Sequence, residues 1–133
     1  RLFAVNNLPR AEHNDSAGTI TVFDISGDNA ERPVELDRIE LPMPYGTFVN
    51  NRNAVQPNST PFQLDLSEDG RQIYVINQRI NQTPSNKEDK GNVLHVVGVS
   101  AEGHLSILQS RELHLDGVRS SARPQGVVAV ALD

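Results

Sequence analysis

Glu12 and His13 are the residues whose types best fit acid–base chemistry, and they stand side by side in a polar stretch that continues into Asn14 and Asp15. Histidine titrates near neutral pH, so His13 can act as a general base with Glu12 as its partner. The alternative is that this stretch is the solvated tip of a loop. We predict Glu12 and His13 as catalytic candidates.

Arg79 is a third catalytic candidate, because a guanidinium can hold a carboxylate or a phosphate through paired hydrogen bonds. The alternative is an ordinary surface arginine. Four asparagines, Asn50, Asn51, Asn53 and Asn58, crowd one stretch of the sequence. Such amides can bind sugars or surround a cation through their oxygens, although asparagine also stabilises turns. We predict that Asn51, Asn53 and Asn58 bind substrate.

The other chemistry-bearing residues argue against several kinds of site. His95, His104 and His114 lie in predicted strands at a spacing that points to no shared centre, and the chain has no cysteine. The sequence also lacks a Gly-x-Ser-x-Gly elbow, a phosphate-binding loop and a His-Glu-x-x-His motif. We therefore predict no metal site, and the sequence names no cofactor.

Charge and composition limit the partners. The chain has 17 acidic and 12 basic residues, a net charge of −5, and only two lysines, which argues against nucleic acid. No stretch approaches the ~18 apolar residues of a membrane span, so no membrane partner is expected. The lack of cysteine is in keeping with a periplasmic or secreted protein. Because the chain begins with Arg1, we expect a processed or partial chain.

The predicted elements are nearly all strands, because apolar and polar residues alternate with a period of two. The alternation predicts strands at residues 1–7, 19–25, 34–41, 62–66, 71–77, 93–99, 104–115 and 126–132. Residues 67–70, Ser-Glu-Asp-Gly, predict a hairpin turn. Asp65 lies in an apolar strand, where its carboxylate must find hydrogen bonds, and we predict that it braces one four-stranded unit against the next. Asn7 and Asn77 are predicted to form turns after their strands.

Internal repetition organises these strands. Residues 1–7 align with residues 71–77, and residues 22–26 align with residues 96–100. Glu40-Leu41 matches Glu112-Leu113, and residues 61–66 resemble residues 124–129. Four strand types, which we name A to D, therefore recur in one order, with a period near 70 residues. Four-stranded antiparallel units in series are typical of a β-propeller, in which each unit is a blade.

One repeat resembles a known family. The pattern Pro61-x-x-Leu-x-Leu-Ser-x-Asp-Gly-Arg-x-Ile-Tyr-Val-x-Asn77 resembles the repeat of the YVTN propellers, although Ile76 stands where threonine is typical. These are similar to phosphogluconolactonase-like and carboxymuconate-cyclising propellers, which usually have seven blades. The resemblance implies an all-β fold of antiparallel four-stranded blades. It also implies a lactonase-like or cyclase-like hydrolase acting on a small polar, anionic substrate, and the alternative is a non-enzymatic ligand- or protein-binding propeller.

The repeat divides the chain into blade portions. Residues 1–41 supply strands B, C and D of one blade, residues 61–115 a full blade, and residues 123–133 strand A of a further or closing blade. We expect a partial β-propeller whose ring is completed by missing residues of the same chain or by another subunit. The longest connections, B to C and D to A, fall on one face. Because function concentrates on loops held by a rigid scaffold, that face is the predicted site.

Overall fold

The computed structural model describes residues 1–6, 18–41, 48–50, 53–55, 58–80, 93–113 and 126–130. It is an all-β structure with two antiparallel sheets of three and four strands. The first sheet has the order β1 (Leu2–Asn6), β2 (Gly18–Asp24), β3 (Val34–Leu41). The second has the order β6 (Asn58–Leu66), β7 (Gln72–Ile80), β8 (Val93–Val99), β9 (Leu105–Glu112). A short hairpin joins β4 (Phe48–Asn50) to β5 (Asn53–Val55), and a 3-10 turn, η1, spans Gly27–Ala30. Within the described ranges, no helix has the length and apolar character needed to cross a membrane.

The all-β antiparallel fold predicted from the alternation is confirmed, and several elements differ from expectation. β6 and β7 are longer than predicted, because their ladder continues as far as the pair Asn58 and Ile80. The hairpin β4–β5 lies in a connection that was expected to be irregular. The strand predicted at residues 126–132 is wrong for its described part, because residues 126–130 join no ladder.

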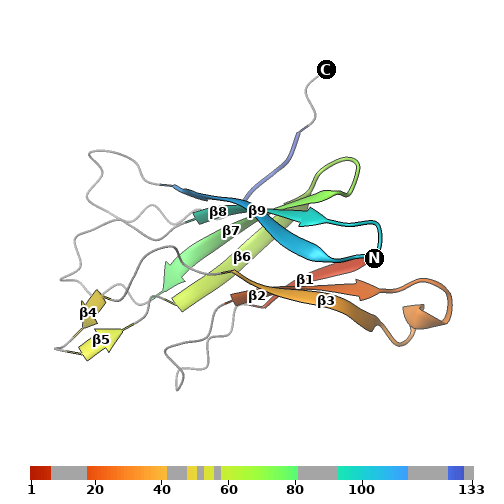
Figure 1. Ribbon diagram of the computed structural model, residues 1–133, viewed down its shortest axis with the longest axis horizontal. Coiled ribbons are helices and arrows are strands. Elements are labelled where there is room, and N and C mark those ends of the chain that lie inside the picture. Colours follow the sequence, from red (N-terminus) through yellow and green to blue (C-terminus); the bar gives the residue numbers. More distant parts are fainter. Residues whose placement is uncertain are drawn as a thin grey trace.

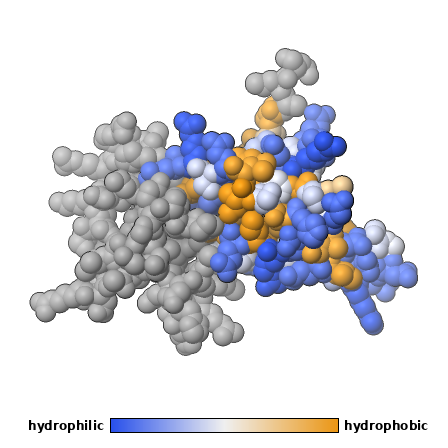
Figure 2. Space-filling view, viewed as in Figure 1, coloured by the Kyte–Doolittle hydropathy of each residue, from blue (hydrophilic) through white to orange (hydrophobic). Residues whose placement is uncertain are grey.

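The two sheets pack face to face, with β1 and β2 against β6 and β3 against β9 (Figure 1). Their shared core contains Ile20 and Leu41 from the first sheet and Ile73, Val75 and Val97 from the second, all fully buried. Aliphatic side chains buried from water in this way supply the main attraction between sheets. Hydrophilic side chains gather at the turns, and an apolar band crosses the middle of the described part (Figure 2).

Both sheets contain the same irregularity. A register shift lies between Val22 and Phe23 where β2 pairs with β3, and another lies between Val96 and Val97 where β8 pairs with β9. The bulged residue on the partner strand is Leu36 in one sheet and Leu108 in the other. A bulge is a specific feature of a strand pair, so its recurrence supports the repeat.

The bulges also correct the sequence alignment by one residue. They place the row Ala4, Thr21, Arg38 in register with the row Val75, His95, Ser110. Asn6, rather than Asn7, therefore corresponds to Asn77. A shift of one residue moves every side chain of a strand to the other face, so the correction decides which side chains of β1 and β7 are equivalent.

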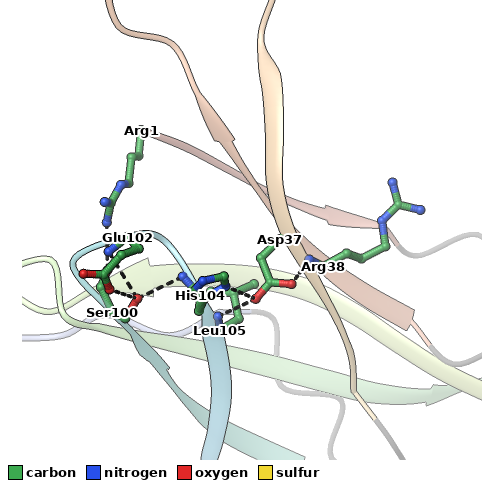
Figure 3. Close-up of polar contacts among 7 residues, drawn as sticks. All are labelled: Arg1, Asp37, Arg38, Ser100, Glu102, His104 and Leu105. Atoms are coloured by element: carbon green, nitrogen blue, oxygen red, sulfur yellow. Dashed lines mark hydrogen bonds and ion pairs between the residues drawn. The ribbon is translucent and has the colours of Figure 1, made fainter.

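Polar contacts clamp the two sheets together at the turn end (Figure 3). The Arg1 guanidinium donates to the carbonyl oxygens of Ser100 (3.0 Å) and Ala101 in the β8–β9 turn. Asp37 Oδ2 accepts the backbone N–H of Leu105 at 2.7 Å, and Asp37 Oδ1 accepts the N–H of Arg38 at 2.8 Å. These two N–H groups, the Leu105 one first, lower the pKa of Asp37. The carboxylate is therefore held ionised as a clasp between β3 and β9.

Gly103 should be the glycine least tolerant of substitution, because it has a φ of 101° and a Cβ placed there would lie 2.8 Å from Leu36 Cδ1. Gly70 has a φ of 66° and open space around it, which alanine tolerates better. We expect Gly103→Ala to lower the free energy of unfolding by about 2 kcal/mol or more. Gly70→Ala should cost only about 1 kcal/mol. Urea unfolding of both variants checks this, and equal losses would contradict the packing described for Leu36.

Candidate functional site

The strand ends that border the long connections lie together at one end of the stack, opposite the turns (Figure 1). A direct contact supports this placement, because the carbonyl oxygen of Leu41 at the end of β3 accepts a hydrogen bond from Asn77 near the end of β7. The described anchor points are Asn6, Gly18, Leu41, Asn58, Ile80, Val93 and Glu112. They agree with a loop face built from the B–C and D–A connections.

Two strands project beyond the rest of the second sheet at this end. β8 begins at Val93, opposite Asn77, whereas β6 and β7 continue to pair as far as Asn58 and Ile80. We call residues 58–60 and 78–80 the β6–β7 extension. Apart from Ile80 it consists of polar and charged residue types. The sheet therefore carries a polar arm at the predicted face.

Arg79 and Asn58, two of the predicted site residues, both lie on this extension. Arg79 was expected just past its strand, but the β6 ladder continues and places it inside β7, directly opposite Ser59. Asn58 is opposite Ile80, one step further along the ladder. The fold thus places Arg79 and Asn58 on adjacent strands, at positions one step apart that belong to opposite faces of the sheet.

The other predicted site residues are not brought to this arm by anything described. Asn53 begins β5, opposite Asn50 of β4, in a separate hairpin. Glu12, His13 and Asn51 lie outside the described residues. Among the residues that are described, no group of three or more His, Cys, Asp or Glu side chains could hold a metal ion.

A buried polar row lies next to the extension, and sequence analysis did not identify it. Asn77 of β7 and His95 of β8 are fully buried, with His95 Nε2 3.1 Å from Asn77 Nδ2. His95 Nδ1 lies 2.7 Å from the Oγ of Ser110 on β9. Asn77 Nδ2 also donates to the carbonyl oxygen of Leu41 at 3.3 Å. The row therefore crosses three strands of one sheet and reaches the other sheet.

Hydrogen-bond roles fix the state of His95. Asn77 Nδ2 must be a donor because the Leu41 carbonyl can only accept, so His95 Nε2 is the acceptor of the second Asn77 proton. The remaining proton of a neutral imidazole is then on Nδ1, which donates to Ser110. Burial lowers the pKa of His95 from 6.5 to about 4. His95 is therefore neutral at physiological pH.

This geometry is unsuited to nucleophilic catalysis, although serine, histidine and asparagine stand in sequence across the sheet. An activated serine must donate its proton to a free imidazole lone pair. Here Ser110 receives a proton from Nδ1, and the only lone pair, on Nε2, is taken by Asn77. The row provides partners for both ring nitrogens of the buried His95 and joins the sheets through Asn77 and Leu41.

The first sheet repeats the same device in a simpler form. Asn6, the counterpart of Asn77, directs Nδ2 to the Oγ1 of Thr19 (3.0 Å) and of Thr21 (3.4 Å). Thr21 is the counterpart of His95 and is almost fully buried. The recurring asparagine was the available signal in the sequence. Asn77 was predicted to end its strand, which is wrong because it lies inside β7 and is buried.

Asp65 binds a segment distant in sequence, which agrees with the predicted bracing role; that this segment belongs to a further unit stays a prediction. Its Oδ2 accepts the backbone N–H of Ala129 at 2.7 Å, and its Oδ1 accepts the N–H of Leu66 at 2.9 Å. Asp65 thus repeats the pattern of Asp37, with one oxygen on the following residue and one on a distant segment. A groove of about 830 Å³ lies beside this contact, lined by Leu66, Ser67, Glu68, Asp69, Gln72, Tyr74, Ala129 and Val130.

Comparison of the chain with protein-family models, with curated proteins and with solved structures finds no match. The site is therefore interpreted from its own residues.

The free energy of unfolding should decrease as the pH is lowered, because of His95. Its pKa is lower in the folded state than in the unfolded state, so its contribution is complete above pH 6.5 and is lost as the pH falls toward 4. Between pH 7 and pH 5 we expect a loss of ~2 kcal/mol from this group. In urea unfolding at the two pH values, His95→Gln should remove most of that loss.

The matched control is His104→Gln, because His104 is largely exposed, at 73% of its side chain. This variant should keep the wild-type pH dependence. The assignment would be contradicted if His95→Gln and wild type lost the same stability between pH 7 and pH 5.

Proposed function

We propose that this chain is part of a repeat-built scaffold of the β-propeller type that binds a small polar, anionic ligand at its loop end. The observation that carries the proposal is the β6–β7 extension, which sets Arg79 directly opposite Ser59 at the predicted loop face. An arginine paired across strands with a hydroxyl-bearing residue is suited to carboxylates and phosphates.

The scaffold part of the proposal is supported by repetition at two levels. The bulge between β2 and β3 recurs between β8 and β9. The asparagine near the end of β1 recurs near the end of β7, with a buried polar partner each time. Such consistency is expected of consecutive blades, whose ring would be completed by further repeats.

The rigid surroundings of the arm favour a binding role. The extension continues directly from the buried row of Asn77 and His95, in which both ring nitrogens of His95 have hydrogen-bond partners. A site supported by locked side chains loses less conformational entropy when a ligand binds. Because the chain has a net charge of −5, the positive charge of Arg79 would also be a local attraction for an anion.

A hydrolase of the lactonase or cyclase type is the second candidate. β1 ends at Asn6 and β2 begins at Gly18, so the connection that carries Glu12 and His13 is anchored at the same end as the extension. In this version Arg79 holds the anionic group, and His13 acts as a general base with Glu12 as its partner. Both candidate functions involve a small anionic ligand, and only the hydrolase would convert that ligand into a product.

Isothermal titration with 6-phosphogluconate tests the proposal, since the resemblance of residues 61–77 points to sugar-acid lactones. We expect binding that Arg79→Ala weakens at least tenfold, because a charge-assisted hydrogen bond contributes ~1.5–3 kcal/mol. The matched control is Arg111→Ala, an exposed arginine on β9, which should bind like wild type.

Hydrolysis of 6-phosphoglucono-δ-lactone distinguishes the candidates. Binding without turnover supports the scaffold, and turnover that His13→Ala abolishes supports the hydrolase. If Arg79→Ala and Arg111→Ala bind equally well, the assignment of Arg79 is wrong.

A further inference from the structure

The second sheet has two faces, and only one of them is covered by the first sheet. The covered face contains the row Val75, His95, Ser110. The opposite face contains the row Asp65, Tyr74, Val96, Gln109. The bulged Leu108 belongs to this opposite face as well, because its Cδ atoms lie over Gly98. We call it the outer face.

The outer face matches, position by position, the surface by which the first sheet contacts the second. With the bulges aligned, Phe3 corresponds to Tyr74, Ile20 to Leu94, Val22 to Val96, Leu36 to Leu108, and Asp37 to Gln109. The apolar character is kept at the first four of these positions, and the fifth keeps a side-chain oxygen that can accept a hydrogen bond.

At two of these positions the side chain contacts a neighbouring sheet in the first sheet and is exposed in the second. Leu36 packs against Gly103 of the neighbouring sheet, and Asp37 accepts the N–H of Leu105 there. Their counterparts Leu108 and Gln109 are exposed, with Leu108 at 57%. Together with the half-buried Tyr74, Leu94 and Val96 of the same face, Leu108 gives the outer face an apolar character that is covered at the matching positions of the first sheet.

Residues 126–130 show how a partner would be seated. In the described pair of sheets, the first strand of the later sheet, β6, lies against β1 and β2 of the earlier one. Residues 126–130 lie over the outer face at β6, where the Ala129 N–H is held by Asp65 and a Cβ at Gly126 would meet the side chain of Gln63. Gln72 and Tyr74 of β7, the counterpart of β1, line the groove beside Ala129 and Val130. The segment is extended but joins no ladder, and Val128 and Val130 are 75% and 73% exposed.

We propose that the outer face docks a further antiparallel sheet in which residues 126–130 are the first strand. This sheet would bring a turn like that of residues 100–105, with a glycine beneath Leu108 and a free backbone N–H for Gln109. The inference rests on the repeat scaffold of the proposed function and adds the surface that joins one repeat to the next. The groove beside Ala129 and Val130 is the space that the new sheet would close.

A second copy of this chain fits the surface less well. A second copy would have to use its turn between β2 and β3. When the bulges of the two sheets are aligned, Pro33 in that turn corresponds to Leu105. Proline has no N–H to donate, so the contact made by Asp37 could not be repeated by Gln109. The proposal therefore commits to a sheet with the β8–β9 type of turn.

An extended chain tests this. Residues 67–113 are repeated directly after Ala129, which aligns with Leu66, so that a complete further sheet is available. Leu108→Cys is introduced in the first copy only, and because the chain has no cysteine this thiol is the single alkylation site. We expect iodoacetamide to react at least tenfold more slowly with the extended chain than with the 133-residue chain.

Val34→Cys is the matched control, since Val34 is 48% exposed on β3 and away from the outer face. Its reaction rate should be the same in both chains. Equal rates for Leu108→Cys, or immediate hydrogen exchange throughout the added segment, would overturn the proposal. If the thiol of Leu108→Cys in the 133-residue chain reacted more slowly as the protein concentration was raised, the outer face would bind a second copy of the chain, and the proposal would be overturned. Arg79→Ala should leave the protection of Leu108→Cys unchanged. The docking test therefore stands even if the proposed anion binding fails.

Discussion

The burial of aliphatic side chains between the two sheets is the interaction on which the other features depend. Ile20 and Leu41 meet Ile73, Val75 and Val97 in a dry layer, and neither sheet could bury its apolar face alone. That layer excludes water from His95 and Asn77, which is why the imidazole is neutral and its hydrogen bonds are fixed. It also sets the relative position of β3 and β9, so that Asp37 meets the N–H of Leu105. The polar arm of β6 and β7 starts from this rigid base.

Much of the fold was predictable, because period-two alternation is a direct consequence of a sheet with one apolar face. The strands, their order and the Ser67–Gly70 turn follow from residue types. The register did not follow, since residues 1–7 and 71–77 share more letters one position away from their structural alignment. Letters were matched by identity, whereas the bulges at Val22 and Val96 are set by the pairing of neighbouring strands. Residues 126–130 read as a strand because they are apolar, but a ladder also needs a neighbour with free backbone groups.

The candidate site was predictable in part, for a different reason. Arg79 and Asn58 were recognisable as residue types suited to anions and sugars, and the ladder between β6 and β7 placed them on adjacent strands. His95 was considered only as a metal ligand and set aside. Its role became clear once Asn77 and Ser110, 18 residues before it and 15 after it, were found beside it. Contacts between strands distant in sequence leave little local pattern, apart from the recurrence of the asparagine.

The seating of residues 126–130 has a mechanical consequence. Among the described residues, one hydrogen bond from Asp65 to Ala129 fixes the backbone of this segment, whereas each sheet is closed by a ladder of many bonds loaded together. A pulling force applied through the segment would act on that single bond first and release it at low load. The sheets would resist until several ladder bonds were sheared at once. Among the described contacts, the one between Asp65 and Ala129 is therefore a compliant point, and tension through residues 126–130 would detach this segment before the sheets unfold.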